Sequence, residues 1–128
     1  MSATVMVLED DPALQDLLCE VLQDEGHTVI AVATFAALVE QIPRKVDLLI
    51  SDMLVDLRPI GLEAINAVRE ATKRPVPAIL CTGAANHIET HHVQISQMGA
   101  FVLHKPFSID GLINAVNAAL QRIPNVCA

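Results

Sequence analysis

Five short apolar runs, none of which alternates with polar residues, limit the folds that this chain can adopt. They cover residues 4–8, 28–32, 46–51, 77–82 and 101–103. Strands that are apolar on both faces are typical of parallel sheets with helices packed on both sides. Each run is followed by a segment that reads as a helix. The chain is therefore expected to alternate strand and helix five times.

The helical segments begin and end at recognisable signals. Asp11 precedes Pro12, Thr34 precedes a segment that Pro43 closes, and Ser108 precedes the last helix. Further helices are expected over residues 61–71 and 88–98. An alternating pattern of this kind predicts an open α/β fold with right-handed crossovers. We predict a flavodoxin-like three-layer sandwich, with a five-stranded parallel sheet of order 2-1-3-4-5 and five helices.

Composition narrows the class of protein. The chain has 128 residues, 52% hydrophobic, which predicts one domain over 1–128 with its core at about 4–121. The net charge of −7 argues against nucleic acid and anionic membranes as partners. We find no signal peptide and no membrane span, and Cys19, Cys81 and Cys127 show no paired spacing. We therefore expect a cytoplasmic protein with reduced thiols.

Polar residues stand at the carboxyl ends of four of the five predicted strands. Glu9 and Asp10 follow the first, Asp52 follows the third, Thr82 ends the fourth and Lys105 follows the fifth. In the predicted strand order these ends are neighbours, and ligands of such sheets bind at this edge. Asp52 could instead cap a helix, and Glu9 and Asp10 could simply favour a helix N-terminus. Asp11 alone would serve as the helix cap, so three consecutive acids are more than a cap needs. This excess favours a functional site at Glu9 and Asp10.

The chemistry of this set is suited to phosphoryl transfer. Three carboxylates that repel one another form an oxygen-rich site of the kind that Mg²⁺ prefers. Lys105 and the Thr82 hydroxyl can meet phosphoryl oxygens. Asp52 can act as the nucleophile and become an aspartyl phosphate.

Four motifs give the chain a resemblance to a known family. They are VLEDDP (7–12), LLISD (48–52), ILCTG (79–83) and HKPF (104–107). In this order and spacing they resemble the receiver domain of two-component response regulators, the CheY-like family. The resemblance implies that Asp52 accepts a phosphoryl group from a histidine kinase or a histidine phosphotransfer protein. The domain would then switch the binding of a downstream protein, and it would catalyse only its own phosphorylation and dephosphorylation.

The resemblance also implies roles for individual residues. Glu9, Asp10, Asp52 and the backbone carbonyl of Leu54 would surround Mg²⁺. Thr82 and Lys105 would sense the phosphoryl group and shift the region of residues 88–103. Pro106 would follow a cis peptide bond.

Three departures from the family pattern stand out. Asp56 replaces a common Pro, and Gly61 comes nine residues after Asp52 rather than eight, which is similar to receivers of hybrid histidine kinases. The usual aromatic switch position is Val102, with Phe101 beside it. Either Phe101 takes a related part or signalling does not use that rotamer, and we favour the second alternative. The positions two after Asp52 and two after Thr82 are Leu54 and Ala84, and neither side chain can orient an attacking water, so we expect slow self-dephosphorylation.

Other interpretations stay open. A pseudo-receiver would bind partners without phosphorylation, and a small Mg²⁺-dependent phosphohydrolase would need a second acid where Leu54 stands. His87, His91 and His92 are interpreted as a polar helix surface rather than a metal site. The sequence does not decide between monomer and homodimer, and it does not identify the kinase or the output partner.

Overall fold

The computed structural model describes residues 2–54, 58–83 and 85–121, and it has the predicted α/β architecture. Every predicted strand is present, within two residues at each end. In chain order the elements are β1 (Thr4–Leu8), α1 (Pro12–Asp24), β2 (Thr28–Val32), α2 (Phe35–Gln41), β3 (Leu48–Asp52), α3 (Ile60–Thr72), β4 (Ala78–Thr82), α4 (Ala85–Thr90), α5 (His92–Met98), β5 (Phe101–His104) and α6 (Ile109–Gln121).

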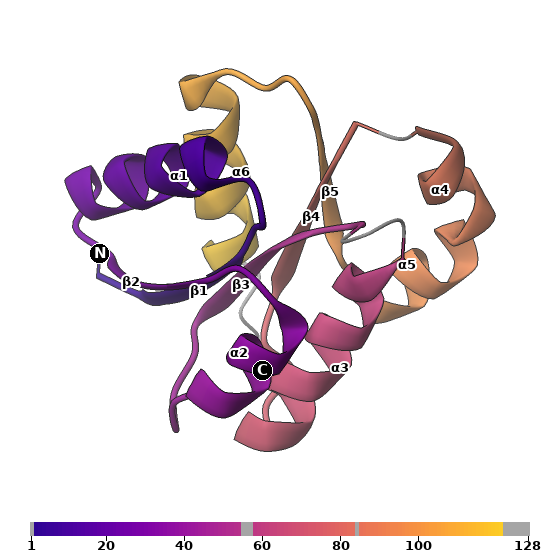
Figure 1. Ribbon diagram of the computed structural model, residues 1–128, viewed down its shortest axis with the longest axis horizontal. Helices are drawn as coiled ribbons and strands as arrows, with labels where there is room; N and C mark the ends of the chain where they lie inside the picture. Colours follow the sequence, from indigo (N-terminus) through magenta and orange to yellow (C-terminus); the bar gives the residue numbers. More distant parts are fainter. Residues whose placement is uncertain (1, 55–57, 84, 122–128) are drawn as a thin grey trace.

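The five strands form one parallel sheet in the order β2-β1-β3-β4-β5, as predicted. Figure 1 shows α1 and α6 on one face of this sheet and α2 and α3 on the other. The register places Leu8 opposite Ser51, Asp52 opposite Cys81 and Thr82 opposite His104. The carboxyl ends of β1, β3, β4 and β5 therefore meet along one edge.

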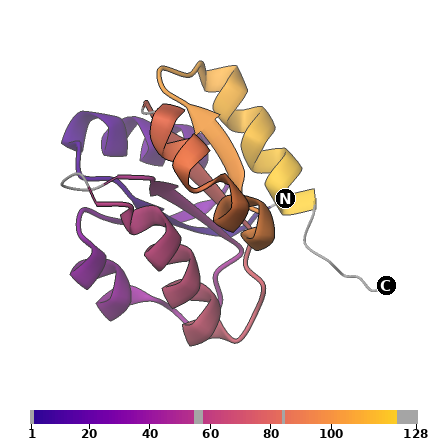
Figure 2. The ribbon, with the colours of Figure 1, turned by 90° about the vertical axis from the view of Figure 1, so that its right-hand side faces the viewer.

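The sheet separates two aliphatic cores, one against each layer of helices (Figure 2). Successive residues of β3 alternate between them, because side chains of a strand point to opposite faces. Leu49 packs with the layer of α2, α3 and α5, whereas Leu48 and Ile50 pack with α1 and α6. All three are at most 1% exposed. Burial on both faces explains why the strands are apolar throughout.

Side-chain caps fix the starts of three helices at the predicted residues. Each cap oxygen accepts an amide proton from the first turn, which would otherwise lack a partner. The pairs are Asp11 Oδ1 with Ala13 N at 3.2 Å, Thr34 Oγ with Ala37 N at 3.1 Å and Ser108 Oγ with Gly111 N at 2.9 Å.

The prediction of a single helix over residues 88–98 was wrong. Two short helices, α4 and α5, occupy this region, so the described residues contain six helices rather than five. His91 separates them with φ −109° and ψ 16°, outside the helical range. The His92 ring lies 3.4 Å from the Glu89 carbonyl, which Val93 N would bind in one continuous helix.

Two smaller expectations concern membrane spans and the cysteines. None of the described helices has the length and hydropathy of a membrane span. Cys81 is a buried core residue, and burial raises the pKa of its thiol to about 12, so it remains protonated. Cys19 is half-buried, and Cys127 lies outside the described residues.

Candidate functional site

The chain after β1 brings two carboxylates to the edge of the sheet. Glu9 is buried, with 2% of its surface exposed, and Asp10 beside it is exposed. The backbone N–H of Glu9 donates to the Val32 carbonyl at 3.1 Å, which extends the sheet by one residue. One Glu9 carboxylate oxygen accepts the N–H of Asp11 at 3.2 Å. The loop that starts α1 therefore fixes the Glu9 carboxylate.

Asp52 is the last residue of β3, and its side chain is 12% exposed. The hydroxyl of buried Ser51 donates to the Asp52 carbonyl at 2.9 Å. Gly61 lies so close that a Cβ there would sit 2.9 Å from this carbonyl oxygen and 2.7 Å from Leu80 Cδ2. Only glycine allows α3 to begin this close to the end of β3, so Ser51 and Gly61 together determine where Asp52 stands.

Lys105 reaches both acids from the chain after β5. Its Nζ lies 3.2 Å from Glu9 Oε1 and 3.3 Å from Asp52 Oδ1. Its backbone N–H donates to the Thr82 carbonyl at 2.7 Å, and the Lys105–Pro106 peptide bond is cis, as predicted. Thr82 is itself 2% exposed at the end of β4. The structure thus brings together Glu9, Asp52 and Lys105, with Thr82 adjoining Lys105.

The electrostatics of this cluster favour an additional positive charge. Ligand oxygens of Glu9, Asp10 and Asp52 all lie within 4.8 Å of one another. Burial raises the pKa of the Glu9 and Asp52 carboxyls, and Lys105 offsets this only in part. Burial alone would lower the pKa of Lys105, but its attraction to Asp52 and Glu9 outweighs that effect and raises it. Lys105 therefore stays protonated, but its single positive charge does not neutralise the three acids.

A magnesium ion fits the donor chemistry of this cluster. Mg²⁺ binds hard oxygen ligands and retains several waters, so a few carboxylates suffice. Among the residues that the structure describes, Glu9, Asp10 and Asp52 are the one group of acids, histidines or cysteines close enough to share an ion. The role of the Leu54 carbonyl remains a prediction, and Asp56 lies outside the described residues.

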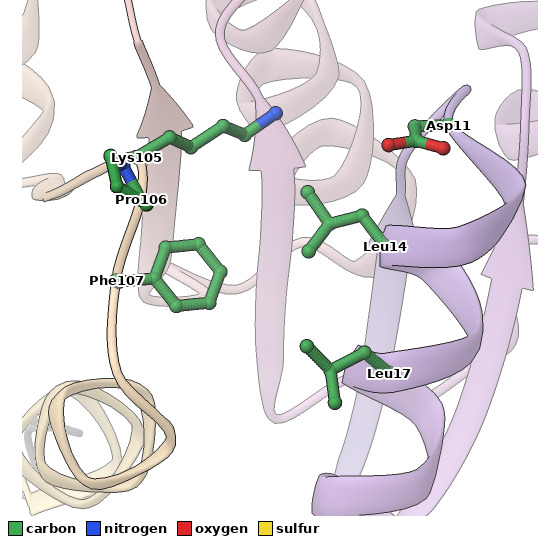
Figure 3. Close-up of a pocket in the computed structure, with 6 residues that line it drawn as sticks. All are labelled: Asp11, Leu14, Leu17, Lys105, Pro106 and Phe107. Carbon is green, nitrogen blue, oxygen red and sulfur yellow. The ribbon is translucent and has the colours of Figure 1, made fainter.

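An open cleft of about 430 Å³ lies beside the cluster. Figure 3 shows Leu14 and Leu17 of α1 pointing across it toward Phe107, with Lys105 at one end. Leu17 is 40% exposed, because it faces this cleft rather than the core.

Sequence reasoning missed the parts that hold the site in shape. Ser51 looked like an ordinary strand residue, and Gly61 was noted only for its spacing from Asp52. Gln15 of α1 was not noted at all, although its amide contacts the carbonyl of Glu9. The local signal for each is weak, because an amide on a helix usually faces solvent and a small residue fits many places.

Among the described residues outside the cluster, no second group of possible metal ligands is found. His92 is exposed, and His91 Nδ1 lies 2.8 Å from Gln94 Oε1. The side chain of His87 lies outside the description. Phe101 and Val102 pack on opposite faces of the sheet, Phe101 toward α6 and Val102 toward α3.

Comparisons with known proteins agree with this geometry. The family model of the response regulator receiver domain matches residues 5–117. The chain is 28% identical over 125 residues to the nitrogen assimilation regulatory protein NtrX of Azorhizobium caulinodans, covering 96% of this chain and 27% of that protein. It is 31% identical over 124 residues to the regulatory protein VirG of Rhizobium radiobacter, covering 95% and 45%. The chain thus spans less than two thirds of these relatives.

Solved structures give the same result. The receiver domain of the TMAO respiratory system response regulator TorR superposes with a TM-score of 0.78 at 31% identity, covering 95% of this chain and 99% of that one. The chemotaxis protein CheY4 of Vibrio cholerae superposes with a TM-score of 0.77 at 25% identity, covering 94% and 100%. The fold, the site and the family match agree, and the chain belongs to the family of response regulator receiver domains.

Proposed function

We propose that this receiver accepts a phosphoryl group on Asp52, from a phosphohistidine of a histidine kinase or of a histidine phosphotransfer protein. An Asp52 carboxylate oxygen forms the new bond to phosphorus. The phosphorus–nitrogen bond to the donor imidazole breaks, and the imidazole leaves with the electron pair and takes up a proton. The observation that carries the proposal is the lysine at 3.3 Å from Asp52, in a cluster of three acids of which Glu9 is buried.

Each side chain at the edge has a part in this reaction. Asp52 ends a strand that Ser51 and Gly61 hold rigidly, so its carboxylate is positioned before the donor arrives. Lys105 can leave Asp52 Oδ1 and follow the charge onto the phosphoryl oxygens while it stays near Glu9. The Thr82 hydroxyl would meet a second phosphoryl oxygen, since Thr82 and Lys105 are joined through their backbones.

The acids would hold a divalent cation for the same step. Asp10, Asp52 and the Leu54 carbonyl would bind Mg²⁺ directly, and Glu9 would act through water because both its oxygens already have partners. When bound, the ion would neutralise negative charge on the carboxylates and on the transferring phosphoryl group.

Phosphorylation would change the charge and the contacts at this edge of the sheet. A phosphoryl group adds about −1.5 to −2 charge at neutral pH. Lys105 follows β5 directly, so a change in its contacts would be passed to β5, α5 and the partner surface of residues 88–103. Because Phe101 and Val102 are packed into opposite cores, we propose that the switch does not use an aromatic rotamer.

The test is intact mass after incubation with acetyl phosphate and Mg²⁺. We expect a single phosphoryl adduct in the wild type, none in Asp52→Asn and none without a divalent cation. Asp16→Asn, an exposed acid on α1, is the matched control and should be phosphorylated like the wild type. If no adduct forms and the beryllofluoride mimic does not bind, the chain is a pseudo-receiver instead.

A further inference from the structure

Gln15 connects α1 to the ends of two strands at the site. Its side-chain Nε2 donates to the Glu9 carbonyl at 3.1 Å and to the Val32 carbonyl at 3.0 Å. A primary amide has two N–H donors, so each carbonyl can take one. The side chain is half-buried. Gln15 therefore binds the carbonyl of the first acid after β1 and the carbonyl of the last residue of β2.

These bonds restrict the peptide unit that leads into Asp10. The N–H of Glu9 donates to the same Val32 carbonyl, at 3.1 Å, so Glu9 is held through its N–H on one side and its C=O on the other. The Glu9 carbonyl lies in one rigid plane with the nitrogen and Cα of Asp10. Fixing the direction of that carbonyl therefore fixes the position of Asp10 N and Cα, the point from which the Asp10 side chain starts.

Asp10 needs this restraint more than its neighbours do. It lies in a bend between β1 and α1, and its side chain is exposed. Glu9 is held by Lys105 and Asp11, and Asp52 by Lys105. Repulsion among three carboxylates within 4.8 Å acts to push the most exposed of them away. The hydrogen bond from Gln15 to the Glu9 carbonyl opposes that movement.

We propose that Gln15 is a positioning residue for the divalent cation: through the Glu9 carbonyl it holds Asp10 where that carboxylate can reach the ion. The inference rests on the proposed function. The competing role is only structural, in which Gln15 attaches α1 to the sheet and affects stability alone. The two roles differ in whether the loss of Gln15 changes the affinity for Mg²⁺ or only the free energy of unfolding.

The experiment compares Gln15→Met with the wild type and with Gln23→Met. Methionine keeps the length of the side chain but removes both donors, and Gln23 is an exposed residue of the same helix. Calorimetric titration of the unphosphorylated proteins with MgCl₂ gives the affinity. We expect Gln15→Met to bind Mg²⁺ about tenfold more weakly, because the loss of a residue that orients a metal ligand typically lowers metal affinity by about that factor. Gln23→Met should bind Mg²⁺ like the wild type.

A kinetic experiment separates binding from reaction. The Mg²⁺ concentration for half-maximal phosphorylation by acetyl phosphate should rise in Gln15→Met by the same factor as the dissociation constant. The rate at saturating Mg²⁺ should stay at the wild-type level. Gln15→Arg, which keeps N–H donors at this position, should recover most of the affinity.

Two results would overturn the inference. One is an unchanged Mg²⁺ affinity in Gln15→Met together with a lower free energy of unfolding. The other needs no variant: in the wild type, the Gln15 side-chain amide resonances should shift over the same Mg²⁺ range as the Asp10 backbone amide, and their failure to shift would contradict the proposal. A wild type that neither binds Mg²⁺ nor takes up phosphoryl would instead remove the proposed function.

Discussion

At the amino edge of the sheet polar side chains bind the backbone, whereas at the carboxyl edge a lysine and a group of acids face one another. His27 Nδ1 accepts the N–H of Ala3 at 3.1 Å, and Asp47 Oδ2 accepts the N–H of Thr4 at 2.8 Å. Arg69 behaves in the same way and donates to two backbone carbonyls. Each of these contacts satisfies a group that the end of a strand or helix leaves without a partner.

The carboxyl edge has a different balance. Glu9, Asp10 and Asp52 carry three negative charges against the one positive charge of Lys105, which leaves a formal charge of −2. Burial of charge that is not fully paired costs stability. The amino edge therefore stabilises the fold, whereas the carboxyl edge gives up stability by holding acids that are not fully paired close together.

The largest effect on stability should come from the amino edge. Arg69 Nε donates to the Val76 carbonyl at 2.9 Å and Nη2 to the Met98 carbonyl at 2.8 Å, which joins α3 to the segment before β4 and to the end of α5. Arg69→Met keeps the aliphatic part and removes both bonds, so we expect a loss of about 2–3 kcal/mol in the free energy of unfolding. Urea titration without Mg²⁺ measures it.

The control for that variant is Arg74→Met, because Arg74 is an exposed arginine close in the chain. We expect its free energy of unfolding to stay within about 0.5 kcal/mol of the wild type. Arg69→Met should bind Mg²⁺ as the wild type does. A weaker affinity for Mg²⁺ in that variant would show that the two edges are not independent.

The carboxyl edge should respond in the opposite direction. Asp52→Asn removes one of three repelling carboxylates while the shape of the side chain is kept. In the absence of Mg²⁺ and at neutral pH, we expect the free energy of unfolding to rise by about 1 kcal/mol. The exposed variant Asp16→Asn is the control and should show little change. A destabilised Asp52→Asn would mean that the pair with Lys105 contributes more than the repulsion costs.

Much of this arrangement could be predicted from the sequence, because the patterns involved are local. Uniformly apolar strands indicate a parallel sheet, and in a parallel sheet the residues after each strand meet at one edge. That reasoning predicts that Glu9, Asp52 and Lys105 lie together, and the structure shows their contacts. The caps at Asp11, Thr34 and Ser108 were predictable for the same reason.

The parts that could not be predicted depend on contacts between elements. The bond from Gln15 to the Glu9 carbonyl requires the angle at which α1 leaves the sheet. The tight fit at Gly61 requires the distance between α3 and the end of β3. The break at His91 was missed because the polar pattern of residues 88–98 is equally compatible with one helix or two.

The smallest expected effect is the pH dependence of stability that comes from Asp52 and from its repulsion of Glu9. Burial raises the pKa of this carboxyl in the folded protein, whereas in the unfolded chain it titrates near its ordinary value of about 4. Between these two values the folded state binds more protons than the unfolded state, so the stability that Asp52 contributes falls as pH rises. The contribution is fully retained below about pH 4. It is lost once the pH passes the folded pKa.

This dependence can be measured as a difference between two proteins. The asparagine of Asp52→Asn does not titrate, so subtracting the wild-type free energy of unfolding cancels most of the other ionisations. Without Mg²⁺, the advantage of Asp52→Asn should be largest at neutral pH and should shrink as the pH falls toward 4. The higher stability of Asp52→Asn at neutral pH and its decline at lower pH come from the same buried charge in the wild type, so the two should be observed together. An advantage that stays constant with pH would show that it arises from packing or hydrogen bonding, and that repulsion among the acids does not reduce the stability of the carboxyl edge.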